Sequence, residues 1–148
     1  VDYFEINYTH AKTKLLVDKP SEVGNDRICN IMGAKVINAP AIIIDFGTAT
    51  TFDIVGKDGS YNGGIIAPGV NLSLEALYIA AANLPKVSLK PLKDKSSSII
   101  GKNTISAMES GIFWGYVSMI EGLVEKGSHH NLLLASRFWT WGATLFKV

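Results

Sequence analysis

The stretch AIIIDFGTATTFDIV, residues 41–55, decides how this chain is interpreted. Ala41 to Ile44 form a short continuous apolar run, which is typical of a strand covered on both faces. Asp45 ends the run with a carboxylate, and a turn containing Gly47 follows. Residues 51–55 return to β-forming types. The pattern predicts a β-hairpin, and KDGS after it predicts a second turn before a third strand.

The residue types of this hairpin suit a nucleotide phosphate. Gly47 lets the backbone approach a ligand, while the hydroxyls of Thr48 and Thr50 can donate to phosphate oxygens. Asp45 supplies a carboxylate that can hold a cation. The alternative is that Asp45 merely ends a strand and that Gly47 and Thr48 merely turn the chain.

Further motifs flank the hairpin in a fixed order. The chain contains KPSEVGNDRICN (19–30), YNGGIIAPGVNLSLEAL (61–77), AANLP (81–85) and NTISAMESGIFWGYVSMIEGL (103–123). With the hairpin, these blocks resemble the type III pantothenate kinases of bacteria over about residues 14–126. The resemblance implies an α/β fold, the second ribonuclease-H-like domain of the acetate kinase/Hsp70/actin superfamily.

The resemblance also implies an activity and a domain division. The family phosphorylates pantothenate from ATP, the first step of coenzyme A biosynthesis. Its members carry a D-x-G-N-T phosphate loop in a first domain that does not match here, so we expect residues 1–126 to be the C-terminal kinase-like domain. We expect residues 1–148 alone not to turn over ATP, because one wall of the nucleotide cleft is absent. Residues 127–148 form an atypical tail, for which a shifted reading frame or a damaged C-terminus is our hypothesis.

Site roles come with the resemblance. Asp26 is implied as the general base that accepts the pantothenate hydroxyl proton, and Gly24, Asn25, Asp26 and Arg27 as the lining of the substrate site. Thr104 is implied to contact pantothenate from the neighbouring subunit of a homodimer. Thr48 is implied to contact ATP phosphate, and Asp45 to ligate a monovalent cation, potassium or ammonium, with magnesium accompanying ATP. Two positions depart from the family: Asn25 replaces a usual Ala, and Val17 a frequent Tyr.

Simpler alternatives exist for several of these motifs. Without the family context, the simpler interpretation of Asp26 and Arg27 is an ordinary surface ion pair near a helix start. Gly63-Gly64 and Pro68-Gly69 are more often tight turns than ligand contacts. Thr104, beside Asn103, has a helix-capping role as its alternative.

Composition limits the other function classes. The 148 residues are 47% hydrophobic and 18% charged, which predicts one globular domain with a packed core. A net charge of +1 gives no electrostatic case for nucleic acid or membrane, and no run approaches the roughly 18 apolar residues of a membrane span. We therefore expect a cytoplasmic protein. Cys29, the single cysteine, is predicted to be a small buried hydrophobe without a redox role.

Periodicity predicts the remaining elements. These are a short strand at 15–17, helices at 22–32, 72–82 and 104–126, and a surface loop at 86–101. Val36-Ile37 leads into the central hairpin. Phe113 and Trp114 are interpreted as core or subunit contacts. His129-His130 is not interpreted as a metal site, because adjacent strand residues point to opposite faces.

Three functional interpretations remain open at this level. The first is the truncated pantothenate kinase, and the second is a catalytically inactive remnant acting at most as a dimerisation module. The third is a regulatory acyl-transfer or transcription-linked relative with a similar hairpin. The GNDR and NTISAMESG motifs argue against the third interpretation. Only an activity assay separates the first two interpretations.

Overall fold

The computed structural model describes residues 5–34, 40–81, 83–88 and 98–128, with two short strands at 135–136 and 146–147. The elements in chain order are η1 (Tyr8–His10), η2 (Pro20–Glu22), α1 (Asn25–Ala34), β1 (Ala41–Phe46), β2 (Ala49–Val55), β3 (Tyr61–Pro68), α2 (Val70–Ala80), α3 (Thr104–Ser128), β4 (Ala135–Ser136) and β5 (Phe146–Lys147). This mixture of helices and strands agrees with the predicted α/β class.

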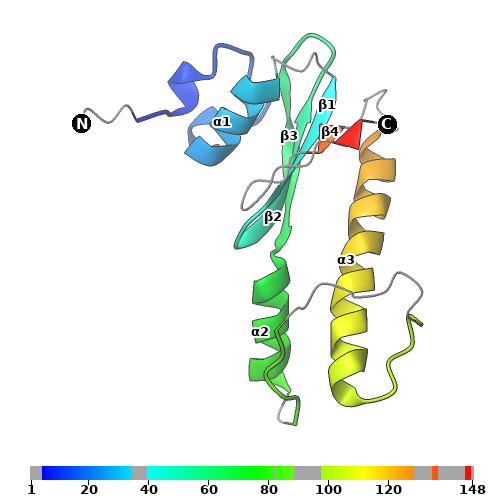
Figure 1. Ribbon diagram of the computed structural model, residues 1–148. Coiled ribbons are helices and arrows are strands. Elements are labelled where there is room, and N and C mark those ends of the chain that lie inside the picture. The colour runs from blue at the N-terminus through cyan, green and yellow to red at the C-terminus, as the bar shows by residue number, and fades with distance from the viewer. Residues whose placement is uncertain are drawn as a thin grey trace.

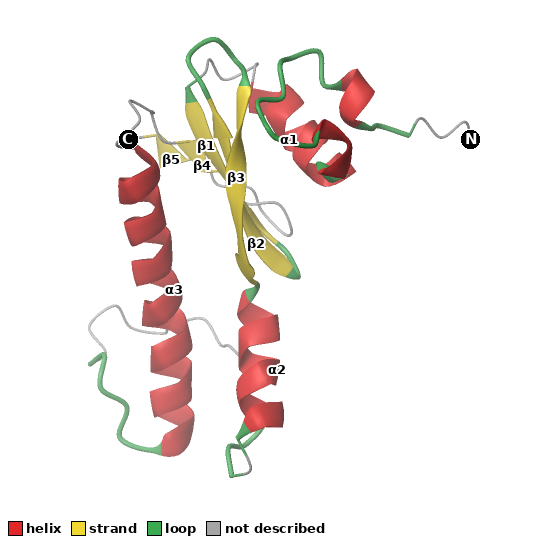
Figure 2. Ribbon diagram, turned by 180° about the vertical axis from the view of Figure 1, so that it is seen from behind, coloured by secondary structure: helices red, strands yellow, loops and turns green. Residues whose placement is uncertain are grey.

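The predicted hairpin is confirmed and forms the centre of the molecule. β1 and β2 pair antiparallel with Asp45 opposite Thr51, and β3 joins the other side of β2, again antiparallel. The apolar run of β1 is buried throughout, as expected for a strand covered on both faces. Ile43 packs with Ala34 of α1 on one face. On the other face, Ile42 and Ile44 pack with residues of α3, namely Ile120, Leu123 and Val124. Figures 1 and 2 accordingly show α1 and α3 on opposite sides of the sheet.

The third strand contains a β-bulge that changes which face its residues present. Asp53 lies opposite Gly64 and Val55 opposite Tyr61, so β3 has one residue more than β2 across this interval. Gly63 carries the irregularity with φ +104°, a conformation that favours glycine. As a consequence Tyr61 and Gly64 both face α1, although their spacing in a regular strand would place them on opposite faces.

Several sequence predictions need correction here. Gly63-Gly64 lies within β3 and does not form a tight turn. Cys29 is exposed, because the buried stripe of α1 is formed by Ile28, Ile31 and Ala34. The helix predicted at 22–32 begins at Asn25, since residues 20–22 form a separate 3-10 turn with Pro20 at its start. The strand predicted at 15–17 is reduced to one bridge between Leu15 and Tyr61.

The helices predicted after the sheet are present with small boundary shifts. α2 covers Val70–Ala80 where 72–82 was predicted, and α3 covers Thr104–Ser128 where 104–126 was predicted. Pro68 and Gly69 form the junction of β3 and α2. Outside the described residues lie Val36-Ile37, Ser96-Ser97 of the predicted loop, His129-His130 and most of the predicted tail.

Candidate functional site

The GNDR motif forms the start of α1 and presents its carboxylate to solvent. Ile28 N–H donates to Gly24 C=O at 3.0 Å, which forms the first helical turn. Asp26 lies in that turn and is exposed. A β-carbon at position 24 would lie 2.5 Å from Asp26 Oδ1, so the carboxylate folds back over the helix start. A negative charge is favourable at this end of a helix. Asp26 is therefore both accessible and electrostatically tolerated.

Arg27 points toward the sheet and pairs with Asp53, not with the neighbouring Asp26. Its Nε donates to Asp53 Oδ1 at 2.7 Å. The Arg27 side chain is 14% exposed and that of Asp53 is 0% exposed. Tyr61 Oη also donates to Asp53 Oδ1, at 3.1 Å, and its ring centroid lies 5.7 Å from the guanidinium carbon of Arg27. The interpretation of Asp26 and Arg27 as a surface ion pair is thus wrong.

Burial and neighbouring charges shift the pKa values of Asp53 and Tyr61 in this cluster. Burial raises the pKa of Asp53, while the Arg27 guanidinium and the hydrogen bonds from Arg27 and Tyr61 oppose that rise. Burial, followed by the charge of Asp53, raises the pKa of Tyr61 well above its usual range. The Tyr61 hydroxyl therefore keeps its proton and acts as a donor to Asp53.

Asp53 is the site residue that sequence reasoning missed. The hairpin pattern accounts for Asp53 as one of the β-forming residues 51–55, so the sequence alone assigns it no further role. A signal was nevertheless present, since a carboxylate within a buried strand requires a partner of opposite charge. Only the three-dimensional arrangement identifies Arg27 as that partner.

Asp45 and Thr48 lie at the hairpin end of the same sheet. Asp45 is half-buried and, two residues after Ile43, lies on the α1 face of β1. Thr48 is exposed in the turn. Gly69 N–H donates to Thr48 C=O at 2.9 Å, which brings the N-terminus of α2 beside the turn. A threonine hydroxyl beside a helix N-terminus is an arrangement suited to phosphate.

Thr104 lies apart from the other predicted site residues. It is exposed at the first position of α3, at the opposite end of that helix from the sheet contact (Figure 1). Asn103 caps the helix, because Ser106 N–H donates to Asn103 Oδ1 at 2.9 Å and Asn103 N–H donates to Ser106 Oγ at 3.1 Å. The capping role considered for Thr104 therefore belongs to Asn103.

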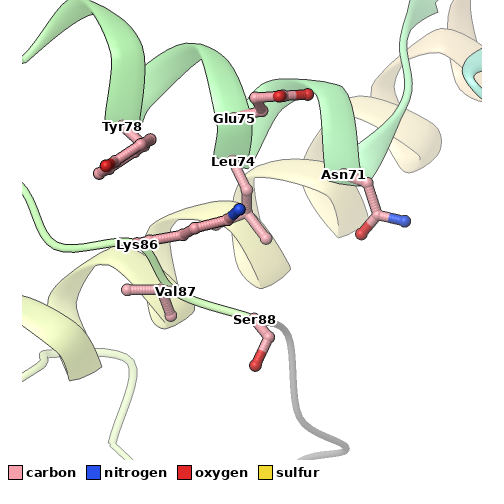
Figure 3. A pocket seen from close by; sticks show the side chains of 7 residues that line it. All are labelled: Asn71, Leu74, Glu75, Tyr78, Lys86, Val87 and Ser88. Carbon is pink, nitrogen blue, oxygen red and sulfur yellow. The ribbon is translucent and has the colours of Figure 1, made fainter.

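Two open cavities lie along α2. One of about 770 Å³ is bordered by Leu77, Leu84, Thr104 and Met108, among others, between α2 and the start of α3. The second, of about 310 Å³, is bordered by side chains of α2 and of residues 86–88, and Figure 3 shows Tyr78, Leu74 and Lys86 at its rim. The second cavity contains none of the predicted site residues.

Two further features of the described residues bear on function. Within those residues no three His, Cys, Asp or Glu side chains gather as a metal site would require. None of the helices in this part of the chain combines the length and apolarity needed to cross a membrane.

Comparison with known proteins identifies the family. The family described as "Type III pantothenate kinase" matches residues 4–126. The chain is 56% identical over 113 residues to a type III pantothenate kinase of Paramagnetospirillum magneticum, covering 76% of this chain and 42% of the relative. It is 51% identical over 132 residues to that of Acidiphilium cryptum, covering 84% and 48%.

A solved structure shows a related fold. The crystal structure of a conserved putative Baf family transcriptional activator from Campylobacter jejuni aligns with a TM-score of 0.54 at 24% identity, covering 79% of this chain and 52% of that one. At this identity the likeness concerns the fold alone. The chain spans less than half the length of the curated relatives named above. The family match over residues 4–126 and the identity to these relatives show that the chain belongs to the type III pantothenate kinase family.

Proposed function

We propose that this protein contributes to the transfer of the ATP γ-phosphate to pantothenate, which gives 4'-phosphopantothenate and ADP in the first step of coenzyme A biosynthesis. The observation that carries the proposal is the exposed carboxylate of Asp26 at the start of α1, followed in sequence by Arg27, whose guanidinium is held by Asp53. Phosphoryl transfer needs a base at the attacking hydroxyl and fixed positive charge near the anionic substrates.

Asp26 is the proposed catalytic residue. Its carboxylate accepts the proton of the pantothenate hydroxyl while that oxygen attacks the γ-phosphorus and ADP departs. Gly24 and Asn25 line the substrate from the loop before α1 and from its first turn. Arg27 contributes positive charge from a side chain that is 14% exposed.

The hairpin end of the sheet is the proposed nucleotide side. Thr48 contacts an ATP phosphate beside the N-terminus of α2. Asp45 ligates a potassium or ammonium ion together with carbonyl oxygens, since a single carboxylate suits a hard, weakly held cation. Magnesium enters with ATP. We also propose that the fold is of the ribonuclease-H-like class.

The position of Thr104 on α3 supports the proposal of a homodimer. Sixteen residues of α3 separate Thr104 from Ile120, which packs on the sheet, and this corresponds to about 24 Å along the helix. α1 lies on the other side of the sheet (Figure 2). Thr104 therefore does not reach a substrate at Asp26 of its own chain, and a second copy of the chain is needed to supply it. A cytoplasmic location stays a prediction.

A coupled assay of pantothenate-dependent ADP release, with potassium present, tests the proposal. The matching 113 residues of the Paramagnetospirillum magneticum relative are replaced by those of this chain, and the chimera is compared with residues 1–148 alone. We expect turnover by the chimera, and none by residues 1–148 alone. An inactive chimera that folds and dimerises would instead favour the alternative, a non-catalytic remnant that serves as a dimerisation module.

A further inference from the structure

We propose that Asp53 and Tyr61 position the guanidinium of Arg27 for substrate binding, Asp53 as the main positioning residue. The inference rests on the proposed function only in the ligand that Arg27 contacts. That Arg27 is held in one orientation by a buried carboxylate follows from the geometry of the described residues alone.

Two contacts orient the guanidinium, and a third contact, a hydrogen bond, anchors the Tyr61 ring against Asp53. Asp53 Oδ1 accepts from Arg27 Nε at 2.7 Å and from Tyr61 Oη at 3.1 Å, so one oxygen ties both side chains together. The Tyr61 ring lies beneath the guanidinium at 5.7 Å. Because Asp53 is 0% exposed, water does not compete for this oxygen.

The backbone of β3 is built to admit this arrangement. The bulge at Gly63 turns Tyr61 onto the α1 face, where its hydroxyl reaches Asp53. Gly64 lies opposite Asp53 on the same face. A β-carbon at position 64 would overlap Arg27 Nη2 and the Phe52 carbonyl oxygen, so the absence of a side chain gives the guanidinium its place.

The consequence for function is preorganisation. With Nε held by Asp53 and Nη2 buried against Gly64, the guanidinium has one orientation before any ligand arrives. An anionic ligand then meets a charge whose orientation is already fixed. Replacement of Asp53 by Asn keeps the shape but removes the charge that orients Arg27, and it leaves Asp26 untouched.

The orientation of Arg27 is tested directly by nitrogen-15 NMR of the arginine Nε–H groups in the full chain. Arg27 and Arg137 are the arginines of the sequence, so the Arg27→Lys variant assigns the signal. We expect the Arg27 Nε–H of the unsubstituted chain to exchange with solvent at least roughly 10-fold more slowly than the same group in Asp53→Asn. Equal exchange of Arg27 in the two proteins would overturn the inference.

A calorimetric titration of the chimera with pantothenate and with ATP distinguishes positioning from a merely structural role. We expect Asp53→Asn to weaken pantothenate binding roughly 10- to 100-fold, with ATP binding unchanged and Asp53→Glu restoring part of the loss. Tyr61→Phe keeps the ring and should weaken pantothenate binding less. Asp58→Asn, on the exposed turn before β3, is the matched control and should have no effect. Equal weakening for both ligands, or none, counts against the inference.

The two proposals fail in different ways. If the chimera binds neither pantothenate nor ATP while the Arg27 Nε–H of residues 1–148 is protected as expected, then the proposed function fails and the positioning of Arg27 by Asp53 stands. If pantothenate binds but Arg27 is unprotected, then the positioning fails and the proposed function stands.

Discussion

Two carboxylates beside α1 occupy opposite environments, and this difference separates their roles. Asp26 is exposed in the first turn of the helix, whereas Asp53 is fully buried against Arg27 and Tyr61. A general base must reach its substrate, and a positioning carboxylate must be shielded from water. Among the described residues, the exposed one of the pair is therefore the candidate for proton transfer.

Replacement of Asp26 by Asn should lower kcat far more than it weakens pantothenate binding. The amide keeps the shape and still contacts the substrate hydroxyl, yet it does not accept the proton, and loss of a general base costs roughly 10²- to 10⁴-fold. Steady-state kinetics of the chimera described above measures the effect, with Asp58→Asn as the control. A variant with near-parent kcat would remove Asp26 from the mechanism.

Replacement of Asp45 by Asn should act on the nucleotide instead. The change removes a charge that holds the cation but leaves Asp26 in place, so we expect a raised KM for ATP that high potassium partly reverses. The measurement is a series of ATP titrations at increasing potassium. Insensitivity of the variant to potassium would show that Asp45 does not hold the cation.

At the scale of elements, the junction of the hairpin turn and α2 depends on a glycine. A β-carbon at Gly69 would overlap the carbonyl oxygens of Gly47 and Thr48, whereas one at Gly111 on α3 meets open space. We expect Gly69→Ala to destabilise the fold by about 1–3 kcal/mol through overpacking. Gly111→Ala should stabilise it by up to about 1 kcal/mol through helix propensity. Urea unfolding measures both, and equal effects of the two substitutions would contradict this account of the junction.

Elements with strong apolar patterns were predictable from the sequence, and the contacts between them were not. The run from Ala41 to Ile44 predicted the central strand, because a strand that is buried on both faces is apolar at every position. Gly63-Gly64 was misread as a turn, since two glycines fit a bulge as well as a turn and only strand register distinguishes them. The pairing of Arg27 with Asp53 joins residues far apart in sequence, which no local pattern encodes.

At the scale of the whole molecule, α2 and the first part of α3 extend beyond the sheet (Figures 1 and 2). Their apolar side chains are consequently left exposed: Leu72, Leu77, Tyr78, Ile79, Ile105 and Phe113. Among the described residues of these two helices only Leu74 and Met108 are buried, with 6% and 8% of their surface exposed. Exposed apolar side chains gathered in this way are typical of an interaction surface, and Leu77 borders the same cavity as Thr104, the residue proposed to act across a dimer.

We therefore expect the chain to self-associate through these helices. Light scattering at micromolar concentration should give the mass of a dimer or larger species, because burial of the exposed apolar side chains on a second copy removes them from water. Phe113→Glu should shift the equilibrium toward the monomer without loss of folding, since Phe113 is 36% exposed in the single chain. Glu121→Gln, an exposed position on the same helix, is the control and should leave the mass unchanged. A monodisperse monomer that stays in solution would contradict both the dimer and the role proposed for Thr104.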